Sequence, residues 1–285
     1  MSVYRGRFAP SPTGLLHFGS LFAAVISYLD ARIHDGEWLV RIEDIDPLRE
    51  QADAKQAIIK SLEAHGLVSD QAIIFQSERS TLYEAALTEL SATGFAFHCP
   101  CSRKYLDTHN AIHQPACRQQ RTTNLECAIK FKSNKQCYTW QDEFQGLQQH
   151  TLNEDFVLKR KEGFYAYQLA VVCDDLEQNI SHVIRGYDLL DSTPMQLALY
   201  DAFNKPAPVF GHFPVILGET GQKLSKQNLA PAVNDQAALS NLLTVFKAAG
   251  IQLKTRVSTC QQALEEARLN WNRSYLCAKS ELIQA

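Results

Sequence analysis

The stretch RFAPSPTGLLHFGS, from Arg7 to Ser20, places two prolines, a histidine and two glycines between a strand-like segment and a helix-like one. The prolines hold the backbone extended, and Gly19 lets another group approach the backbone closely. Unpaired N–H groups and a partial positive charge make a helix N-terminus a binding site for phosphate. We therefore interpret His17, Gly19 and Ser20 as phosphate-binding candidates. A rigid loop with an ordinary surface histidine is the alternative.

A second loop, GETGQKLSKQ at 218–227, carries Lys223 and Lys226. Their charges could neutralise a polyphosphate while negative charge moves onto a leaving pyrophosphate. A solvated lysine loop would have the same composition. Taken with the first loop, however, this segment favours a site that binds a polyphosphate.

A cluster of cysteines and histidines predicts a structural zinc site, because Zn²⁺ is held by four thiolate or imidazole ligands in tetrahedral geometry. The proposed ligands are Cys99, Cys101, His113 and Cys117. His98 and His109 are alternatives for the fourth ligand, although their spacing from Cys117 is less suitable. Three buried or free thiols without a metal would explain the same pattern.

Helical and strand-like segments alternate along the first third of the chain, which predicts an α/β fold with a parallel sheet. Strands are expected at 3–9, 37–44 and 71–79, and helices at 20–36, 52–66 and 80–94, with glycines at the helix ends. Ligands bind beyond the carboxyl ends of the strands in such sheets. The stretch that contains His17 is the first loop at that edge.

The remaining chain divides into three parts. Residues 99–154 are rich in Cys, Gln, Asn and Thr and are expected to be an irregular, zinc-binding insertion between 1–98 and the second half of the catalytic domain at 155–234. In that half, the sheet is expected to resume at 155–175 and 182–191, followed by a helix at 194–204 and a strand at 209–217. A helical region is expected at 235–285.

Composition limits the class of protein. The chain has 285 residues, 45% of them hydrophobic, and a net charge of -3, which neither indicates nor excludes a nucleic-acid partner. No apolar run approaches the ~18 residues of a membrane helix, and the N-terminus lacks the apolar core of a signal peptide. We therefore expect a cytoplasmic protein, without a membrane partner, whose eight cysteines are reduced.

Several motifs in order resemble the class I aminoacyl-tRNA synthetases. HFGS at 17–20 is similar to their HIGH motif and KLSKQ at 223–227 to their KMSKS loop. RFAPSPTG, RIEDID, AYQLAVVCDD and HVIRGYDLLDSTP resemble the glutamate branch of that class. The resemblance spans about residues 5–230 and departs from the motifs at Ser20 and Gln227. It implies a Rossmann-like, doubly wound parallel sheet that binds ATP with Mg²⁺.

The same resemblance implies a glutamate pocket formed by Arg7, Ala9, Ser11, Glu43, Tyr167 and Arg185. Glutamate carries three charges, and each needs a partner when it leaves water. By this resemblance Arg7 and Ser11 lie near the α-carboxylate, Arg185 lies near the side-chain carboxylate, and Glu43 pairs with the ammonium group. Tyr167 adds a hydroxyl and a wall. Arg41, Asp44 and Asp46 are instead expected to form ion pairs at a strand end.

Within this branch, the short chain, the Cys-rich insertion and the KLSKQN segment resemble truncated paralogues of glutamyl-tRNA synthetase. Those proteins activate glutamate without tRNA and attach it to the queuosine base in the anticodon of tRNA(Asp). The resemblance implies that an anticodon-binding domain is absent and that His113 replaces a tyrosine ligand of zinc. Two alternatives are a truncated synthetase that acylates a tRNA 3′ end and an inactive RNA-binding paralogue.

Overall fold

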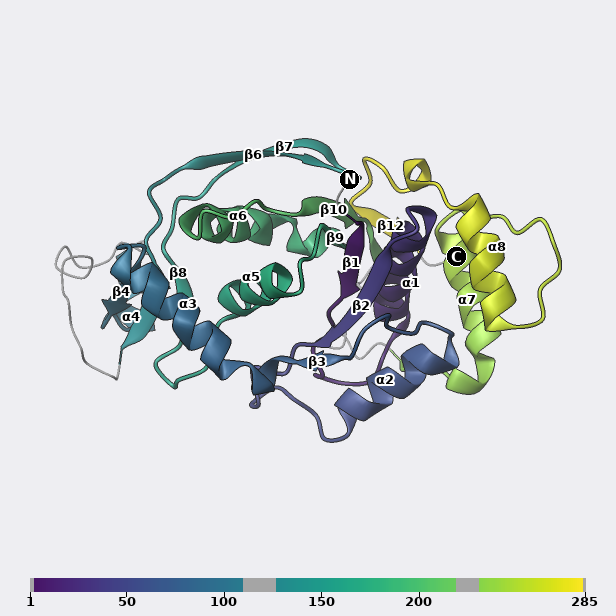
Figure 1. Ribbon diagram of the computed structural model, residues 1–285, viewed down its shortest axis with the longest axis horizontal. Coiled ribbons are helices and arrows are strands. Elements are labelled where there is room, and N and C mark those ends of the chain that lie inside the picture. Colours follow the sequence, from purple (N-terminus) through teal and green to yellow (C-terminus); the bar gives the residue numbers. More distant parts are fainter. Residues whose placement is uncertain (1–2, 110–126, 219–230, 284–285) are drawn as a thin grey trace.

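The computed structural model describes residues 3–109, 127–218 and 231–283 of the chain. A central sheet lies between two groups of helices, and a smaller sheet lies at the end of the molecule opposite α7 and α8 (Figure 1). No helix within the described ranges is long and apolar enough to cross a bilayer.

The central sheet is mainly parallel. Its first three strands, in the order β1-β2-β3, are β1 (Arg5–Phe8), β2 (Glu37–Ile42) and β3 (Ile74–Phe75). The next two parallel strands are β9 (His182–Gly186) and β10 (Val209–Phe213). Backbone N–H of Ser181 donates to the carbonyl of Arg5 over 3.0 Å, which places β9 beside β1. The predicted α/β fold with a parallel sheet is confirmed.

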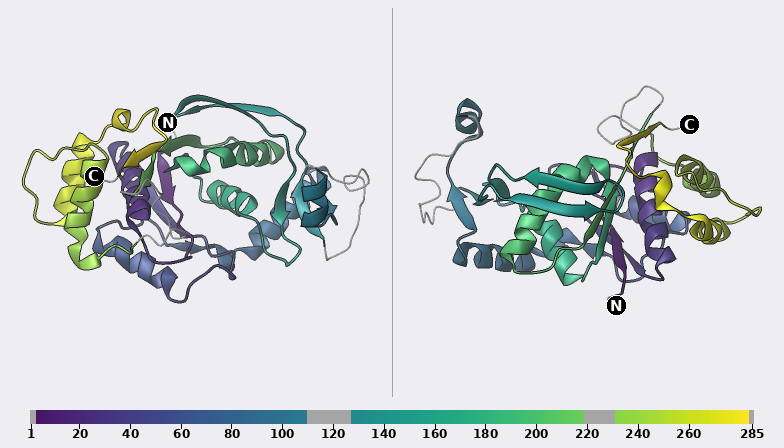
Figure 2. Two further views of the ribbon diagram at one scale, coloured as in Figure 1. Left: turned by 180° about the vertical axis from the view of Figure 1, so that it is seen from behind. Right: turned by 90° about the horizontal axis from the view of Figure 1, so that it is seen from above.

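Helices cover both faces of this sheet and form two hydrophobic cores. One face carries α1 (Phe18–Ile33), α2 (Ala54–Ala64), α7 (Ala238–Ala248) and α8 (Cys260–Asn270). The other face carries α3 (Ser80–Ala92), α5 (Tyr167–Glu177) and α6 (Thr193–Ala202) (Figure 2). Successive residues of β2 alternate between the cores: Trp38 and Val40 enter the first, and Leu39 enters the second.

The first helix, α1, positions the HFGS motif at the carboxyl edge of the sheet. Its apolar stripe is buried against the sheet and against α7 and α8. Gly36 was predicted as its end, but α1 ends at Ile33, and Asp35 adopts the left-handed conformation with φ of 49°. Gly36 is needed for a different reason, because a Cβ there would lie 2.5 Å from the backbone oxygen of Tyr4.

The expectation of an irregular structure over 99–154 is wrong for its described part. A small antiparallel sheet forms from β4 (Ala96–Cys99), β5 (Ala128–Phe131) and β8 (Phe156–Lys159), with α4 (Arg103–Thr108) next to β4 in the chain. The hairpin of β6 (Cys137–Asp142) and β7 (Gly146–Thr151) instead extends the central sheet, where β6 runs parallel to β10. The polar composition of this segment did not prevent its strands from pairing, because a strand such as β6 buries only every second residue.

Two further expectations need correction. The central sheet does not resume at 155–175, since β8 belongs to the small sheet and α5 begins at Tyr167. The run LAVVCDD is buried throughout, and an apolar run buried on every side cannot be assigned to helix or strand from its period. The region after 235 is not wholly helical, because β12 (Glu281–Ile283) pairs in parallel with β11 (Val215–Leu217).

Candidate active site

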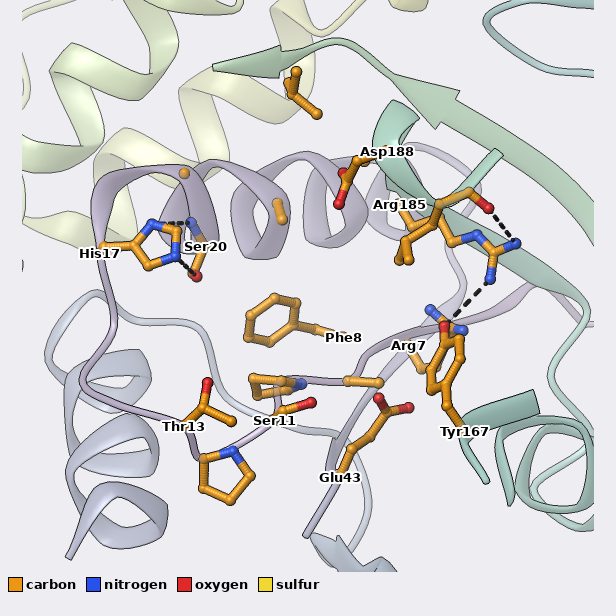
Figure 3. Close-up of a pocket in the computed structure, with 18 of the residues that line it drawn as sticks. Arg7, Phe8, Ser11, Thr13, His17, Ser20, Glu43, Tyr167, Arg185 and Asp188 are labelled. Atoms are coloured by element: carbon orange, nitrogen blue, oxygen red, sulfur yellow. Dashed lines mark hydrogen bonds between the residues drawn. The ribbon is translucent and has the colours of Figure 1, made fainter. Parts of the chain in front are cut away.

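A cavity of about 590 Å³ opens at the carboxyl ends of β1, β2 and β9. Its lining includes the six predicted glutamate-binding residues and the three described members of the predicted ATP site (Figure 3). These residues are Arg7, Ala9, Ser11, His17, Gly19, Ser20, Glu43, Tyr167 and Arg185. Residues that are up to 178 positions apart in the chain therefore share one pocket, as the motifs predict (185 minus 7).

The N-terminus of α1 forms one wall of this pocket. His17 is the N-cap residue, and its Nδ1 accepts a hydrogen bond from the backbone N–H of Ser20 over 3.3 Å. The hydroxyl of Ser20 lies 2.9 Å from His17 Nε2 (Figure 3). The departure at Ser20 from the HIGH motif therefore places a hydroxyl in contact with the first histidine of the motif.

The predicted ATP-site lysines, Lys223 and Lys226, and the motif departure at Gln227 lie outside the described residues. The chain on both sides of that segment borders the pocket. Val215 and Ile216, in the strand before it, line the cavity. After it, the backbone N–H of Val233 donates to the carbonyl of Leu16 over 2.9 Å, and Ala232 pairs with His17.

Below the pocket, buried arginines meet two adjacent carboxylates of α5. Arg41 Nη2 lies 2.8 Å from Asp175 Oδ1, and Arg41 Nε lies 3.6 Å from Asp174 Oδ2. Arg7 donates to both oxygens of Asp175, over 3.3 and 3.5 Å. These guanidinium groups lower the pKa of Asp175 against the effect of burial, so this carboxylate stays ionised and offsets their charge.

The ion pairs expected for Arg41, Asp44 and Asp46 are confirmed, but the three residues do not form one network. Asp44 accepts a hydrogen bond from Lys55 Nζ over 2.6 Å, and Asp46 Oδ2 lies between Arg49 and Arg160 at distances of 2.9 and 3.0 Å. Sequence analysis did not identify Asp174 and Asp175 as functional. A pair of carboxylates at the end of an apolar run in AYQLAVVCDD was the available signal.

Glu43 follows β2 and faces the pocket from its floor (Figure 3). Its side chain is buried, and burial raises the pKa of its carboxyl to about 7, although Arg41 and Arg7 oppose the shift. Its Oε1 lies 3.7 Å from Arg41 Nη2 and accepts no hydrogen bond from any described residue. Glu43 can therefore take a cationic donor from a ligand.

Arg185 projects from β9 and is surrounded by hydrogen-bond acceptors. Its Nη1 donates to Gln196 over 2.9 Å, and its Nη2 donates to Thr193 Oγ1 over 2.9 Å and to the Leu189 carbonyl over 3.2 Å. The contact from Nη1 to the Tyr167 hydroxyl is longer, at 3.5 Å (Figure 3). Because Tyr167 lines the cavity, the N–H on that side is the one most available to a ligand.

The remaining donor of Arg185, Nε, points away from the cavity to a residue that sequence analysis missed. It donates to His212 Nε2 over 2.9 Å, and His212 Nδ1 lies 2.5 Å from Asp142 Oδ2. Burial lowers the pKa of His212 to about 4, with Asp142 opposing and Arg185 adding to the shift. His212 is therefore neutral at neutral pH. Nothing in the spacing of these residues signalled their contact.

The described half of the predicted zinc site lies in the small sheet. Cys99 is buried at the end of β4, and Cys101 packs against the same cluster as Phe97 and Cys99. His98 alternates with Cys99 along the strand, so its side chain is directed to the opposite face. His113 and Cys117 lie outside the described residues. Among the residues that the structure describes, no group of three metal-ligating side chains is found.

Comparisons with known proteins agree with the motifs. The family described as "tRNA synthetases class I (E and Q), catalytic domain" matches residues 3–241. A protein of Idiomarina loihiensis named Glutamyl-Q tRNA(Asp) synthetase is 42% identical over 278 residues, which are 96% of this chain and 98% of that protein. A protein of the same name from Chromobacterium violaceum is 46% identical over 251 residues, 85% of this chain and 84% of that protein.

Among solved structures, the chain is similar to a glutamate tRNA ligase from Elizabethkingia meningosepticum in complex with its amino acid. The TM-score is 0.83 at 23% identity, over 100% of this chain and 67% of the ligase. Glutamate-tRNA synthetase from Elizabethkingia anophelis gives the same TM-score of 0.83 over 98% of this chain and 68% of that one. At this identity the likeness establishes the fold, which is Rossmann-like.

Proposed function

The chain belongs to the class I tRNA synthetases of the glutamate and glutamine branch, and from that premise we propose that it activates glutamate with ATP and transfers it to the queuosine base of tRNA(Asp). Relatives that match nearly its full length carry the name of this activity. The proposal includes activation without tRNA, which distinguishes this enzyme from a synthetase that charges a 3′ end.

One observation supports the proposal: the pocket brings together the two buried guanidinium groups of Arg7 and Arg185 and the buried carboxyl of Glu43. That set complements glutamate, which has two carboxylates and one ammonium group. A buried charge is tolerated only when it is paired, so an amino acid with an uncharged side chain would leave one guanidinium without its anion.

We assign the side-chain carboxylate of glutamate to the end of the pocket where Arg185 and Tyr167 meet. Because Arg185 gives most of its donors to protein acceptors, it would offer one N–H from Nη1, and the Tyr167 hydroxyl would supply a second hydrogen bond. Glu43 would pair with the ammonium group. The ligand's cation would then favour the carboxylate form of Glu43 and reverse its pKa shift.

Arg7 and Ser11 remain the proposed partners of the α-carboxylate. The positive charge of Arg7 acts to lower the pKa of both Glu43 and Arg185, so Arg7 lies near both of these residues in the pocket. Its Nη1 makes no hydrogen bond with any residue in the described ranges, which leaves a donor for the ligand. Ala9 and Ser11 lie on the extended loop beyond β1, where backbone groups and a hydroxyl line the cavity.

The proposed chemistry needs no nucleophile from the protein. The α-carboxylate of glutamate attacks the α-phosphorus of ATP, the bond to the bridging oxygen breaks, and pyrophosphate leaves. His17, Gly19 and Ser20, which line the pocket at the α1 N-terminus, would bind phosphate, and Lys223, Lys226 and an ATP-borne Mg²⁺ would stabilise the charge of the leaving group. Catalysis then consists of alignment and charge stabilisation.

In the second step, a hydroxyl of the queuosine cyclopentene diol attacks the carbonyl carbon of glutamyl-adenylate. AMP leaves with the electron pair of the broken bond, and an ester forms. A vicinal diol resembles that of a terminal ribose, so a pocket of this family can serve either acceptor. The names of the full-length relatives favour the queuosine diol.

We also propose a structural zinc ion held by Cys99, Cys101, His113 and Cys117. The two described cysteines fit, because they pack in one cluster beyond the end of β4. Thiolate ligands at this place would hold the loop after β4 and supply part of the folding energy of the small sheet.

Transfer of radiolabelled glutamate tests the function. The protein is given glutamate, ATP and tRNA(Asp), with and without queuosine, and pyrophosphate exchange is measured without tRNA. We expect exchange without tRNA and label only on the queuosine-containing tRNA. Label on both tRNAs would support 3′-end charging instead, and no exchange together with no label would indicate an inactive RNA-binding paralogue.

A further inference from the structure

The contact between Arg185 and His212 joins a residue of the pocket wall to two side chains, His212 and Asp142, that do not line the cavity. His212 is in β10 and Asp142 ends β6, and both side chains are fully buried. Arg185 Nε donates to His212 Nε2 over 2.9 Å, and the opposite ring nitrogen of His212 lies 2.5 Å from Asp142. The three side chains form a continuous line from the sheet interior to the cavity.

The hydrogen bonds of Asp142 determine which nitrogen of His212 carries the proton. Oδ1 of Asp142 accepts from the backbone N–H groups of Phe144, Gln145 and His212, over 3.1, 3.0 and 3.0 Å. Oδ2 is thereby directed at His212 Nδ1 and accepts its proton. Nε2 must then be the acceptor, which is what the N–H of Arg185 requires.

The surroundings of the guanidinium also contribute to its orientation. The Thr193 hydroxyl lies 2.9 Å from Arg185 Nη2 and 3.2 Å from His212 Nε2, so it can accept from the first and donate to the second. The ring of Phe210 lies against the guanidinium at 5.3 Å. None of these partners offers Arg185 a negative charge, so its charge is left for a ligand.

From this geometry we propose that His212, fixed by Asp142, is a positioning residue that orients Arg185 and thereby makes the pocket selective for glutamate over glutamine. The proposal rests on the proposed function, in which Arg185 meets the side-chain carboxylate. An Arg185 held in this orientation presents one N–H donor to the ligand, and the Tyr167 hydroxyl, which accepts from Arg185 Nη1 over 3.5 Å, can donate its own proton beside it. A carboxylate accepts from them, whereas the NH₂ group of glutamine would oppose one donor with another.

Two substitutions of the same histidine separate positioning from structural support. His212→Asn keeps an N–H for Asp142 but removes the acceptor near Arg185. His212→Gln keeps an acceptor near the position of Nε2 but leaves Asp142 unpaired. In Asp142→Asn, Oδ1 still accepts from the three backbone N–H groups, so the new NH₂ group faces Nδ1 of His212. Nδ1 must then act as the acceptor. The proton of His212 moves to Nε2, where it opposes the N–H of Arg185.

Pyrophosphate exchange with glutamate and with glutamine, together with thermal unfolding, provides the readout. We expect His212→Asn and Asp142→Asn to raise the glutamate KM about tenfold with a much smaller change in kcat, because one charge-assisted hydrogen bond is lost. The ratio of kcat/KM for glutamate to that for glutamine should fall in both. In His212→Gln, KM should be largely rescued although Tm falls.

The matched control is His65→Asn. His65 is also fully buried, and its Nδ1 lies 2.7 Å from the Ser61 carbonyl oxygen, but it does not line the pocket. This substitution should lower Tm without changing KM or selectivity. The proposal is overturned if KM follows Tm across all four variants, or if His212→Asn and Asp142→Asn keep the parent KM and selectivity. Should His212→Asn fail to fold, Asp142→Asn decides alone.

Arg185→Ala distinguishes failure of the positioning role of His212 from failure of the proposed function. If it raises the glutamate KM while the His212 and Asp142 variants do not, the positioning role is wrong and the proposed function stands. If Arg185→Ala itself leaves glutamate activation unchanged, the assignment of the side-chain carboxylate to Arg185 fails, and with it the basis of this inference.

Discussion

Glu43 shows how burial can prepare a side chain for a charged ligand. In the free protein its carboxyl is buried with a pKa of about 7, and one oxygen has no hydrogen-bond donor among the described residues. An ammonium group in the pocket would bring a positive charge beside the buried carboxyl and stabilise its carboxylate form. Binding of a cationic ligand group therefore offsets the free-energy cost of burying the Glu43 carboxylate.

This pKa has a consequence for stability. The folded value of about 7 lies above the ordinary value of 4.5, so between these two pH values the folded state binds more protons than the unfolded state. The free energy of unfolding should thus fall as pH rises through this window, by at most about 1.4 kcal/mol per pH unit. Urea unfolding without glutamate should show this decline in the parent and lack it in Glu43→Gln. Parallel pH profiles would contradict it.

Arg185→Ala should abolish measurable glutamate activation. Removing the guanidinium leaves the ligand carboxylate unpaired, which costs on the order of 2 to 5 kcal/mol. Pyrophosphate exchange measures the loss. Arg268→Ala, which removes an arginine paired with Glu265 outside the pocket, is the matched control and should keep the parent rate. Adenylate formation at the parent rate in Arg185→Ala would show that another residue anchors the side chain.

The sequence predicted residues that line the pocket because they lie in contiguous motifs at the carboxyl ends of strands. Arg7, Glu43 and Arg185 each belong to such a motif. His212 and Asp142 were missed because their contact depends on the parallel pairing of β10 with β6. No local period records which strands become neighbours, so contacts between strands are the part of a site that spacing cannot predict.

Among the elements, the junction of α1 with β2 is sterically constrained by a close approach to backbone. Glu37 N–H donates to the Tyr4 carbonyl over 2.9 Å, and Gly36 lies directly against Tyr4. This contact brings the end of α1 close to the start of β1, so the helix that caps the phosphate side of the pocket and the strand that carries Arg7 are held together.

Gly36→Ala should therefore destabilise the protein by about 1–3 kcal/mol, because the new Cβ would meet backbone that cannot rotate away. Chemical denaturation measures this change. Gly94→Ala is the matched control. Gly94 has a φ of +81°, but a Cβ at this position would meet nothing within 4 Å. Only the backbone conformation therefore opposes the substitution, at a cost of about 1 kcal/mol. An equal loss in both variants would show that the close approach to Tyr4 is unimportant.

The small sheet should depend on metal. We expect about one Zn²⁺ per chain, as for a structural site of four ligands, and loss of the metal in Cys101→Ser. Elemental analysis of protein purified without chelator measures both. Cys137→Ser, which alters an exposed cysteine on β6, is the matched control and should retain the metal. A parent protein without metal would refute the site.

The positions of helices were predicted best where an amphipathic segment of the sequence ended in glycine. The helices α2 and α3 lie within the predicted 52–66 and 80–94, and Gly66 and Gly94 adopt the expected positive φ. The helix α5, whose residues 169–175 are all buried, and the short β12 were not predicted. Burial on every side removes the period that distinguishes a helix, and a strand of three residues has too few positions to show alternation.

For the molecule as a whole, the pocket rim suits an RNA acceptor. Arg49 and Arg160 line the pocket and share Asp46, while Glu50 in the same lining pairs with Lys55, so the two guanidinium groups have one carboxylate between them. Phosphates of a nucleic acid are attracted to such a surplus. If the modified base itself enters the pocket, the RNA around it is the part that meets this rim.

An isolated anticodon stem-loop carrying queuosine should therefore accept glutamate, because the nucleotide that is modified is also the one that is recognised. The label should be released by mild alkali, since the product is an ester. The same stem-loop with guanosine in place of queuosine is the matched control and should remain unlabelled. If periodate oxidation of the 3′-terminal ribose alone, with queuosine protected, prevented labelling of tRNA(Asp), 3′-end charging would be the correct reaction.

The contact between β1 and β9 also determines when the pocket can exist. Arg5 and Ser181 are 176 residues apart in the chain, yet their backbones meet in the middle of the sheet. Contacts of such separation form late and slowly, because a long loop must close first. During synthesis, Arg7 and Glu43 emerge well before Arg185, so the nascent chain has no complete site. Competence to bind glutamate is therefore acquired only when the two halves of the sheet join.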